Sequence, residues 1–380
     1  MSTTPKYSPT SLTKDPPRIL ITGGGTGGHV YPAIAIADAV KRQRPDAVVA
    51  FAGSKDRIEW TVVPKAGYPI HSVAARGIQR RITMQNLKVP FTTGLGIWQS
   101  WNLVDHFDAD VAVGTGGFVA GPVIWAAHSR RRPVLIQEQN AHVGVTNRIL
   151  SRFADRIHTA FRETLSTFPP EKTVVSGNPV RAELGQVSKE EARAFFQIDP
   201  GQRVLLVLGG SGGSLAINET FSRQIKDFLH HKETVVIWQT GPNYFQKIDA
   251  TVSAHPRLKI LRFIDRMDMA YAVCDLAICR SGAITCSELM VTATPSILIP
   301  SPNVAADHQT SNARSLESIA ASVVLPEPDM RSRLYDLWQE LWNDSNRLEA
   351  MSVAAHKNAT PDAAETIAAD VLQLAERRFA

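Results

Sequence analysis

Two glycine-rich turns, each between an apolar run and a helical segment, constrain the fold of this chain more than any other feature. The first turn covers residues 23–29 (GGGTGGH) and follows the apolar run 18–22. The second covers residues 209–214 (GGSGGS) and follows the apolar run 203–208. Glycines let a ligand approach the main chain, and the helix that follows presents N–H donors to an anion. The repeat predicts two similar domains, each with a site for a phosphate-bearing ligand.

Short apolar runs alternate with helix-length segments in both halves of the chain. They occupy residues 48–52, 70–73, 111–113, 134–136 and 174–176 in the first half, and 235–238, 258–261, 276–278, 296–299 and 323–325 in the second. Such alternation is typical of a parallel sheet with helices on both faces. We therefore predict an α/β protein with two doubly wound parallel-sheet domains that face each other across a cleft. The expected divisions are a flexible tail at 1–16, domains at 17–180 and 181–360, and a final helical segment at 361–380.

Composition excludes several classes of protein. Hydrophobic residues make up 44% and charged residues 20%, which suits a globular chain and not a disordered one. No apolar run approaches the roughly 18–20 residues that span a bilayer. The three cysteines, Cys274, Cys279 and Cys286, match no zinc or disulfide spacing, which favours a reducing compartment. A net charge of +5 leaves nucleic acid, anionic membranes and anionic substrates open as partners.

A nicotinamide-dependent oxidoreductase is the obvious competing interpretation of the first turn. That class places an acidic residue about 20 residues after the turn to bind the ribose. Here Asp56 lies beyond another glycine, 28 residues after Gly28, so the fit is poor. His29 instead puts a titratable imidazole at the ligand-facing mouth of the domain. A third glycine group at 114–117 follows another apolar run and would form a further wall of the cleft.

Six motifs follow one another in a fixed order along the chain. They are GGTGGH at 24–29, GTGGFVAGP at 114–122, QEQNA at 137–141, GNPVR at 177–181, CRSGAITCSEL at 279–289 and DHQTSNA at 307–313. In this order they resemble the MurG family of bacterial glycosyltransferases. The resemblance implies a GT-B fold of two Rossmann-like domains, with the final helix returning towards the first. It also implies an inverting transfer of N-acetylglucosamine from UDP-N-acetylglucosamine to undecaprenyl-diphospho-muramoyl-pentapeptide, which converts lipid I to lipid II in peptidoglycan biosynthesis.

The resemblance places the UDP-sugar donor mainly in the second domain. Ser211 would contact the diphosphate, the backbone of Ile264 the uracil, and Gln309 the transferred sugar. Glu288, which we predict at the start of a helix, would bind the ribose hydroxyls, because a carboxylate accepts two hydrogen bonds at once. The wall beside it would consist of Ala283, Ile284, Thr285, Cys286 and Ser287. The first domain and the domain boundary would add Thr26, Gly27, Gly28, Asn140 and Arg181, whose guanidinium matches phosphate geometry.

On the acceptor side, we predict His29 as the general base for the muramoyl 4-hydroxyl. Gly25, Gly116 and Gly117 would face the acceptor diphosphate. Structural alternatives stay open: His29 as a helix-start residue bonded to a carbonyl, Glu288 as a helix N-terminal acid, Asn140 and Gln309 as loop amides, and Arg181 as a surface residue near the domain boundary. The family usually has Gln where this chain has Gly212, and Gly where it has Thr294.

We expect neither a metal nor another cofactor. Asp108 and Asp110 spell a DxD motif, but they precede the strand at 111–113, and ligand sites in such sheets lie at the carboxyl ends of strands. We therefore interpret Asp108 and Asp110 as solvent-exposed residues at the amino end of this strand.

A lipid-linked acceptor would bring the enzyme to an anionic membrane surface. Arg80 and Arg81 lie near Phe91 and Trp98, and bases beside apolar groups suit such an interface. The alternative is a core helix at 91–104 behind a solvated loop. The resemblance favours a peripheral protein at the cytoplasmic face of the bacterial cell membrane, with no nucleic acid partner. Another UDP-sugar:lipid glycosyltransferase of the GT-B class, such as a diacylglycerol glycosyltransferase, and a non-catalytic nucleotide-sugar-binding protein remain alternatives.

Overall fold

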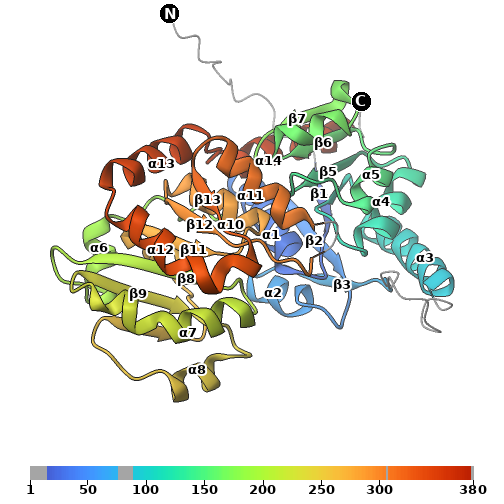
Figure 1. Ribbon diagram of the computed structural model, residues 1–380. Helices are drawn as coiled ribbons and strands as arrows, with labels where there is room; N and C mark the ends of the chain where they lie inside the picture. Colours follow the sequence, from blue (N-terminus) through green and yellow to red (C-terminus); the bar gives the residue numbers. More distant parts are fainter. Residues whose placement is uncertain (1–14, 76–88, 305–306, 378–380) are drawn as a thin grey trace, which may run out of the picture.

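The computed structural model describes residues 15–75, 89–304 and 307–377, and it contains two parallel sheets (Figure 1). The first has the strand order β3-β2-β1-β4-β5-β6-β7 and the second β10-β9-β8-β11-β12-β13. The strands of the first sheet are β1 (Arg18–Thr22), β2 (Val48–Gly53), β3 (Ile70–Ser72), β4 (Val111–Gly114), β5 (Val134–Glu138), β6 (Arg156–Thr159) and β7 (Thr173–Val175). Those of the second are β8 (Arg203–Leu208), β9 (Thr234–Gln239), β10 (Leu258–Leu261), β11 (Leu276–Cys279), β12 (Ser296–Leu298) and β13 (Ser322–Val324). The predicted pair of doubly wound α/β domains is confirmed.

Helices cover both faces of each sheet. The first domain carries α1 (Gly27–Gln43), α2 (Glu59–Lys65), α3 (Val89–Phe107), α4 (Ala120–Ser129) and α5 (Val145–Leu150). The second carries α6 (Lys189–Phe196), α7 (Leu215–His230), α8 (Phe245–Thr251), α9 (Met267–Val273), α10 (Ala283–Val291), α11 (His308–Ser318), α12 (Met330–Trp342) and α13 (Ser345–Lys357). Alternate residues of β1 show the two faces: Ile19 and Ile21 pack with α1, and Leu20 packs with Val123 of α4.

The last helix, α14 (Ala363–Glu376), packs on the first domain although it follows the second in sequence (Figure 1). Its Ile367 and Val371 are buried in the same core as Ile21 of β1. Asp370 of α14 also accepts hydrogen bonds from Arg156 and His158 of β6. Residues 156–159 were not predicted as a strand, because the segment RIHT is largely polar. The contacts with Asp370 explain how this polar strand can lie inside the fold.

The chain passes between the domains twice, before α6 and before α14, and the two passages touch. A β-carbon added to Gly177 would lie 1.7 Å from Thr360 Oγ1, so only glycine fits this contact, and its φ of +89° also favours glycine. Next to it, Asn178 Nδ2 donates to the Gln139 carbonyl of the first domain and to Ser287 Oγ of the second, each at 3.0 Å. The domains are thus connected by both covalent and hydrogen-bonded links at one place.

Candidate active site

A cleft of about 1230 Å³ lies between the domains, at the carboxyl ends of their strands. The glycine turns after β1 and β8 face each other across it, since a β-carbon added to Gly27 would lie 3.9 Å from Ser211 Oγ. Most of the residues that the sequence singled out line this cleft: Gly25, Thr26, Gly27, Gly28, His29, Gly116, Gly117, Asn140, Arg181, Ser211, Ala283, Ile284, Thr285, Glu288 and Gln309. Residues more than 280 positions apart in sequence therefore share one site.

A buried carboxylate supports the first glycine turn. Glu59, in the first turn of α2, is 1% exposed and accepts hydrogen bonds from the backbone N–H groups of Gly25 (2.9 Å) and Ser54 (3.1 Å). A β-carbon added to Gly24 would lie 2.4 Å from this carboxylate, so the turn packs directly on it. The Gly25 N–H is thus engaged by the protein itself. Sequence reasoning missed Glu59, because an acid at the start of a short helix looks like an ordinary surface residue.

The hydrogen bonds of His29 determine which of its ring nitrogens carries the proton. Nδ1 lies 3.1 Å from the Thr115 carbonyl oxygen and 2.9 Å from Gln139 Oε1. The Gln139 orientation is set in turn, because its Nε2 donates to the same Thr115 carbonyl at 2.7 Å. Both partners of Nδ1 are acceptors, so Nδ1 is protonated and the neutral imidazole keeps its lone pair on Nε2. The carbonyl contact considered as an alternative role for His29 is present, and it leaves a basic nitrogen on a ring that lines the cleft.

A second buried carboxylate shapes the loop after β5. Glu138 accepts hydrogen bonds from the backbone N–H groups of Asn140 and Gly144, both at 3.0 Å. From the other domain, Asn312 of α11 donates to Asn140 Oδ1 (3.3 Å) and accepts from the backbone N–H of Ala141 (2.9 Å). The side chain of Asn140 is therefore fixed where the two domains meet.

The Glu288 carboxylate lies between two donors. Its Oε1 accepts from Arg181 Nη2 at 3.2 Å, and its Oε2 accepts from the Tyr271 hydroxyl at 3.1 Å. Helix α10 begins at Ala283, so Glu288 lies in its second turn and does not open the helix as the sequence suggested. This position also removes the helix N-terminal interpretation of Glu288, because the dipole effect is confined to the first turn. Arg181 and Glu288, assigned separate contacts from sequence, form an ion pair in this structure.

The other residues of the expected donor wall divide between the cleft and the core. Ala283, Ile284 and Thr285 line the cleft, whereas Cys286 and Ser287 are buried and do not line it. Cys286 packs in the core of the second domain, because five consecutive residues of a helix cannot all face one side, and Ser287 accepts the hydrogen bond from Asn178.

The backbone of Ile264 is partly engaged already. Its N–H donates to Gln239 Oε1 at 2.8 Å, and its side chain is buried in the core of the second domain. In the expected contact between the Ile264 backbone and the uracil, only the carbonyl group of Ile264 would therefore be available.

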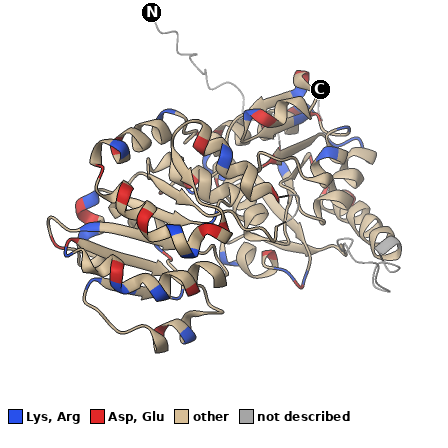
Figure 2. Cartoon of the chain, viewed as in Figure 1, with Lys and Arg blue, Asp and Glu red and all other residues tan. Residues whose placement is uncertain are grey.

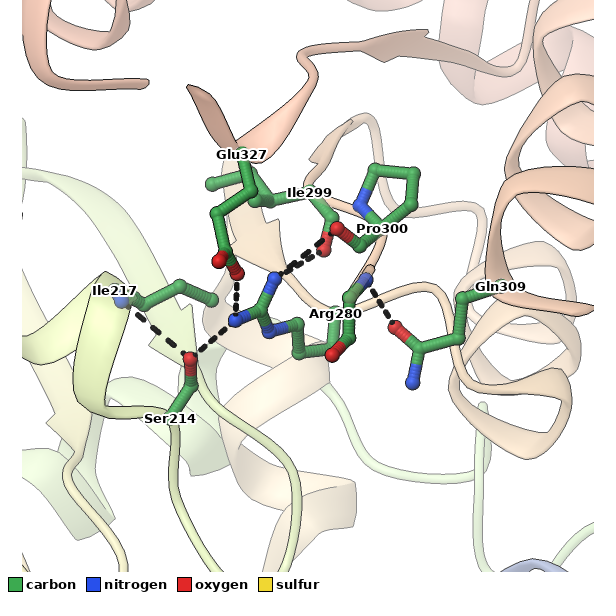
Figure 3. A network of polar contacts seen from close by, with 8 residues as sticks. Ser214, Ile217, Arg280, Ile299, Pro300, Gln309 and Glu327 are labelled. Carbon is green, nitrogen blue, oxygen red and sulfur yellow. Dashed lines mark hydrogen bonds and ion pairs between the residues drawn. The ribbon is translucent and has the colours of Figure 1, made fainter. Parts of the chain in front are cut away.

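A half-buried arginine connects the second glycine turn to the segment after β12 and to Glu327 (Figure 3). Arg280 Nη2 donates to Ser214 Oγ at 2.7 Å and pairs with Glu327, and its Nη1 donates to the carbonyl of Ile299 at 3.1 Å. Ser214 is the N-cap of α7 and accepts from the Ile217 N–H. Arg280 thus fixes the helix N-terminus that follows the turn.

A hydrogen bond from the backbone orients the side chain of Gln309. Its Oε1 accepts from the backbone N–H of Ser301 at 2.8 Å, as the dashed line beside Gln309 in Figure 3 shows. The contact engages the amide oxygen, and the residue lines the cleft.

The two residues that depart from the family pattern, Gly212 and Thr294, differ in their surroundings. A β-carbon at Gly212 would meet no atom within 4 Å, so the turn keeps its shape and only a side-chain contact is lost. Thr294 is buried, and its hydroxyl pairs with that of Thr292 at 2.8 Å, near the start of β12.

The DxD motif lies at the amino end of β4, away from the carboxyl edge where the cleft opens. The expectation of solvent exposure is wrong for Asp110, which is buried and accepts a hydrogen bond from the backbone N–H of Arg18 at 2.8 Å. Asp108 forms an ion pair with Arg132 at 2.9 Å. Across the described ranges, no three His, Cys, Asp or Glu side chains gather closely enough to hold a metal ion.

Helix α3 carries an apolar face at the edge of the first domain, where Figure 2 shows it almost without charged residues. Phe91, Leu95 and Trp98 lie on one side of it and are 82%, 49% and 59% exposed. Trp101 instead packs against Trp125 at 5.4 Å, so the core-helix alternative applies to Trp101 but not to Trp98. Arg80 and Arg81 lie outside the described residues. Of the helices that the structure describes, none is long and apolar enough to cross a bilayer.

Comparison with known proteins defines the class first. Residues 19–159 match the Glycosyltransferase family 28 N-terminal domain, and residues 204–367 match the Glycosyltransferase family 28 C-terminal domain. The two matches cover the two sheets and both glycine turns, so the facing domains are those of a GT-B glycosyltransferase.

Full-length relatives define the family within that class. A Salinibacter ruber protein named UDP-N-acetylglucosamine--N-acetylmuramyl-(pentapeptide) pyrophosphoryl-undecaprenol N-acetylglucosamine transferase is 54% identical over 95% of this chain and 98% of its own length. A Christiangramia forsetii protein of the same name is 41% identical over 94% and 97%. The crystal structure of Acinetobacter baumannii MurG superposes with a TM-score of 0.76 at 28% identity, covering 94% of this chain and all of that one. The chain belongs to the MurG family of N-acetylglucosamine transferases, and the predicted resemblance is confirmed.

Proposed function

We propose that this enzyme transfers N-acetylglucosamine from UDP-N-acetylglucosamine to the muramoyl 4-hydroxyl of undecaprenyl-diphospho-muramoyl-pentapeptide, with inversion at the anomeric carbon. The observation that carries the proposal is the opposition of two glycine turns across one cleft, with His29 beside the first. Two diphosphate-bearing substrates can then meet with a base between them. The names of the relatives support the same donor and acceptor.

The donor occupies the second-domain side in this proposal. The turn at Ser211 and the N-terminus of α7 bind the diphosphate, because helix N-termini attract anions. The Glu288 carboxylate accepts both ribose hydroxyls, and the Gln309 amide donates to a hydroxyl of the sugar. Arg181, next to Glu288, turns its guanidinium towards the diphosphate and offsets the charge on departing UDP.

On the acceptor side, His29 Nε2 removes the proton of the attacking hydroxyl as the C–O bond to the anomeric carbon forms and the bond to UDP breaks. The Nδ1–H contacts with Thr115 and Gln139 hold the ring in the required tautomer and stabilise the imidazolium that results. Gly116 and Gly117 remain the proposed contacts of the acceptor diphosphate, whereas the Gly25 N–H already donates to Glu59.

We also propose that the apolar face of α3, defined by Phe91, Leu95 and Trp98, rests on an anionic membrane surface, and that Arg80 and Arg81, which precede this helix in the sequence, bind the same surface. Because the proposed acceptor is anchored in a membrane by its lipid, the proposed location of the enzyme is the cytoplasmic face of the bacterial cell membrane. Exposed aromatic side chains on an uncharged helix face suit the interfacial region of a bilayer.

The decisive experiment measures UDP release from UDP-N-acetylglucosamine with and without a short-chain lipid I analogue. Release that depends on the analogue, together with a disaccharide product, supports the proposed activity. Release with a diacylglycerol acceptor alone would indicate the alternative lipid glycosyltransferase. Tight UDP binding without turnover on either acceptor would indicate a non-catalytic binding protein.

A further inference from the structure

The carboxylate of Glu288 has one buried and one exposed hydrogen-bond partner. Tyr271, from α9, is 2% exposed and donates its hydroxyl to Oε2 at 3.1 Å. Arg181 approaches Oε1 at 3.2 Å from the segment between the domains, and its side chain is 44% exposed. The contact with Tyr271 is the more rigid of the two, because a buried phenol on a packed helix has far fewer alternative positions than an exposed guanidinium.

A ribose that offers two hydroxyls needs both carboxylate oxygens in a fixed plane. Each oxygen has two lone-pair positions, so one hydroxyl and one protein donor can share it. If Arg181 turns towards the donor diphosphate, Oε1 loses its protein contact at the moment when the ribose arrives. The Tyr271 contact then remains to prevent rotation of the carboxylate about its last side-chain bond.

The protonation state of Tyr271 suits this task. Burial of the phenol and the nearby Glu288 charge raise its pKa well above the usual value. Tyr271 is therefore a neutral O–H donor throughout the physiological pH range. It lines the cleft, and its hydroxyl is engaged by the Glu288 carboxylate.

We infer that Tyr271 is a positioning residue for donor recognition: its hydroxyl orients the Glu288 carboxylate and so determines the preference for ribonucleotide over 2′-deoxyribonucleotide diphosphates. This inference rests on the proposed ribose contact of Glu288. In this inference Tyr271 acts through Glu288 and not on the reacting bond. Its loss therefore affects donor affinity and sugar selectivity, and leaves the chemical step intact once the donor site is saturated.

The test measures the Kd values of UDP and 2′-deoxy-UDP by calorimetry for the wild type, Tyr271→Phe, Glu288→Gln and the double variant. We expect Tyr271→Phe to weaken UDP binding about tenfold, the magnitude of one hydrogen bond to a charged group. The preference for UDP over 2′-deoxy-UDP should fall by about the same factor, with kcat at saturating donor retained. The double variant should show no further loss of preference beyond Glu288→Gln, because both changes act through one carboxylate.

Tyr335→Phe is the matched control, because Tyr335 packs in the aromatic cluster of the second domain with Phe228 and Trp338 and does not line the cleft. It should leave both Kd values unchanged. An equal loss of UDP and 2′-deoxy-UDP affinity in Tyr271→Phe would overturn the inference, since it would reveal a general weakening of the site. An unchanged preference in Glu288→Gln would instead reject the ribose contact itself, and so the proposed donor geometry.

Discussion

Asp370 connects the last helix to the first domain, and its neutralisation should destabilise the protein measurably. Its Oδ2 accepts from Arg156 Nε at 2.7 Å and from His158 Nε2 at 3.1 Å. The hydrogen bond from His158, followed by that from Arg156, outweighs burial and lowers the pKa of Asp370 from 3.8 to about 2. A shift of this size corresponds to about 2.4 kcal/mol, and exposure of Arg156 to solvent reduces the expected value to about 1–2 kcal/mol.

The sign of the pH dependence follows from the lowered pKa. The folded state holds the ionised carboxylate more favourably than the unfolded state, so the stabilisation is complete above about pH 4 and is lost as the pH falls towards 2. Asp370→Asn should therefore reduce the free energy of unfolding by about 1–2 kcal/mol at pH 7 and by about half as much at pH 3. Urea denaturation followed by circular dichroism between pH 7 and pH 3 measures both quantities.

Asp362→Asn is the control for this series, because Asp362 is an exposed acid at the start of the same helix that makes no side-chain capping bond. It should change stability by less than about 0.5 kcal/mol. If Asp370→Asn behaves like this control at pH 7, or if the difference in stability between wild type and Asp370→Asn stays constant down to pH 3, the Asp370 carboxylate does not stabilise the fold through Arg156 and His158.

Three further predictions concern catalysis and location. His29→Ala should lower kcat by about 10²–10⁴-fold with donor affinity retained, and near-normal turnover would refute its role as the base. Glu59→Gln would turn an amide group towards the N–H groups of Gly25 and Ser54, so the KM for the lipid acceptor should rise more than the KM for UDP-N-acetylglucosamine; an equal rise in both would contradict a local effect on the first turn. Phe91→Glu combined with Trp98→Glu should reduce sedimentation with anionic vesicles while turnover of a water-soluble acceptor analogue persists, and unchanged vesicle binding would count against the α3 surface.

The two-domain fold was predictable because the signals for it are local. Each glycine turn stands directly between its strand and its helix, and each apolar run is bounded by turn residues. The missed strand β6 lacks such a local signal, because the partner of its polar residues is Asp370, more than 200 positions away.

The supports of the site could not be predicted for the same reason. Glu59 reaches Gly25 from 34 positions away, and Asn312 reaches Ala141 from 171 positions away. Nothing in the immediate sequence of Glu59 distinguishes it from a surface residue. Asn312 belongs to the motif at 307–313, but the motif does not show that its side chain contacts the first domain. Motif order identified the groups that line the cleft, whereas the residues behind them depend on tertiary contacts that only the structure contains.

The contact between Gly177 and Thr360 holds together the two segments by which the chain passes between the domains. Two segments that pack against each other resist a twist of one domain relative to the other, because such a twist would pull on both segments at once. We expect that lengthening either segment alone would permit this twist, and a pair of spectroscopic labels placed across the cleft would detect it.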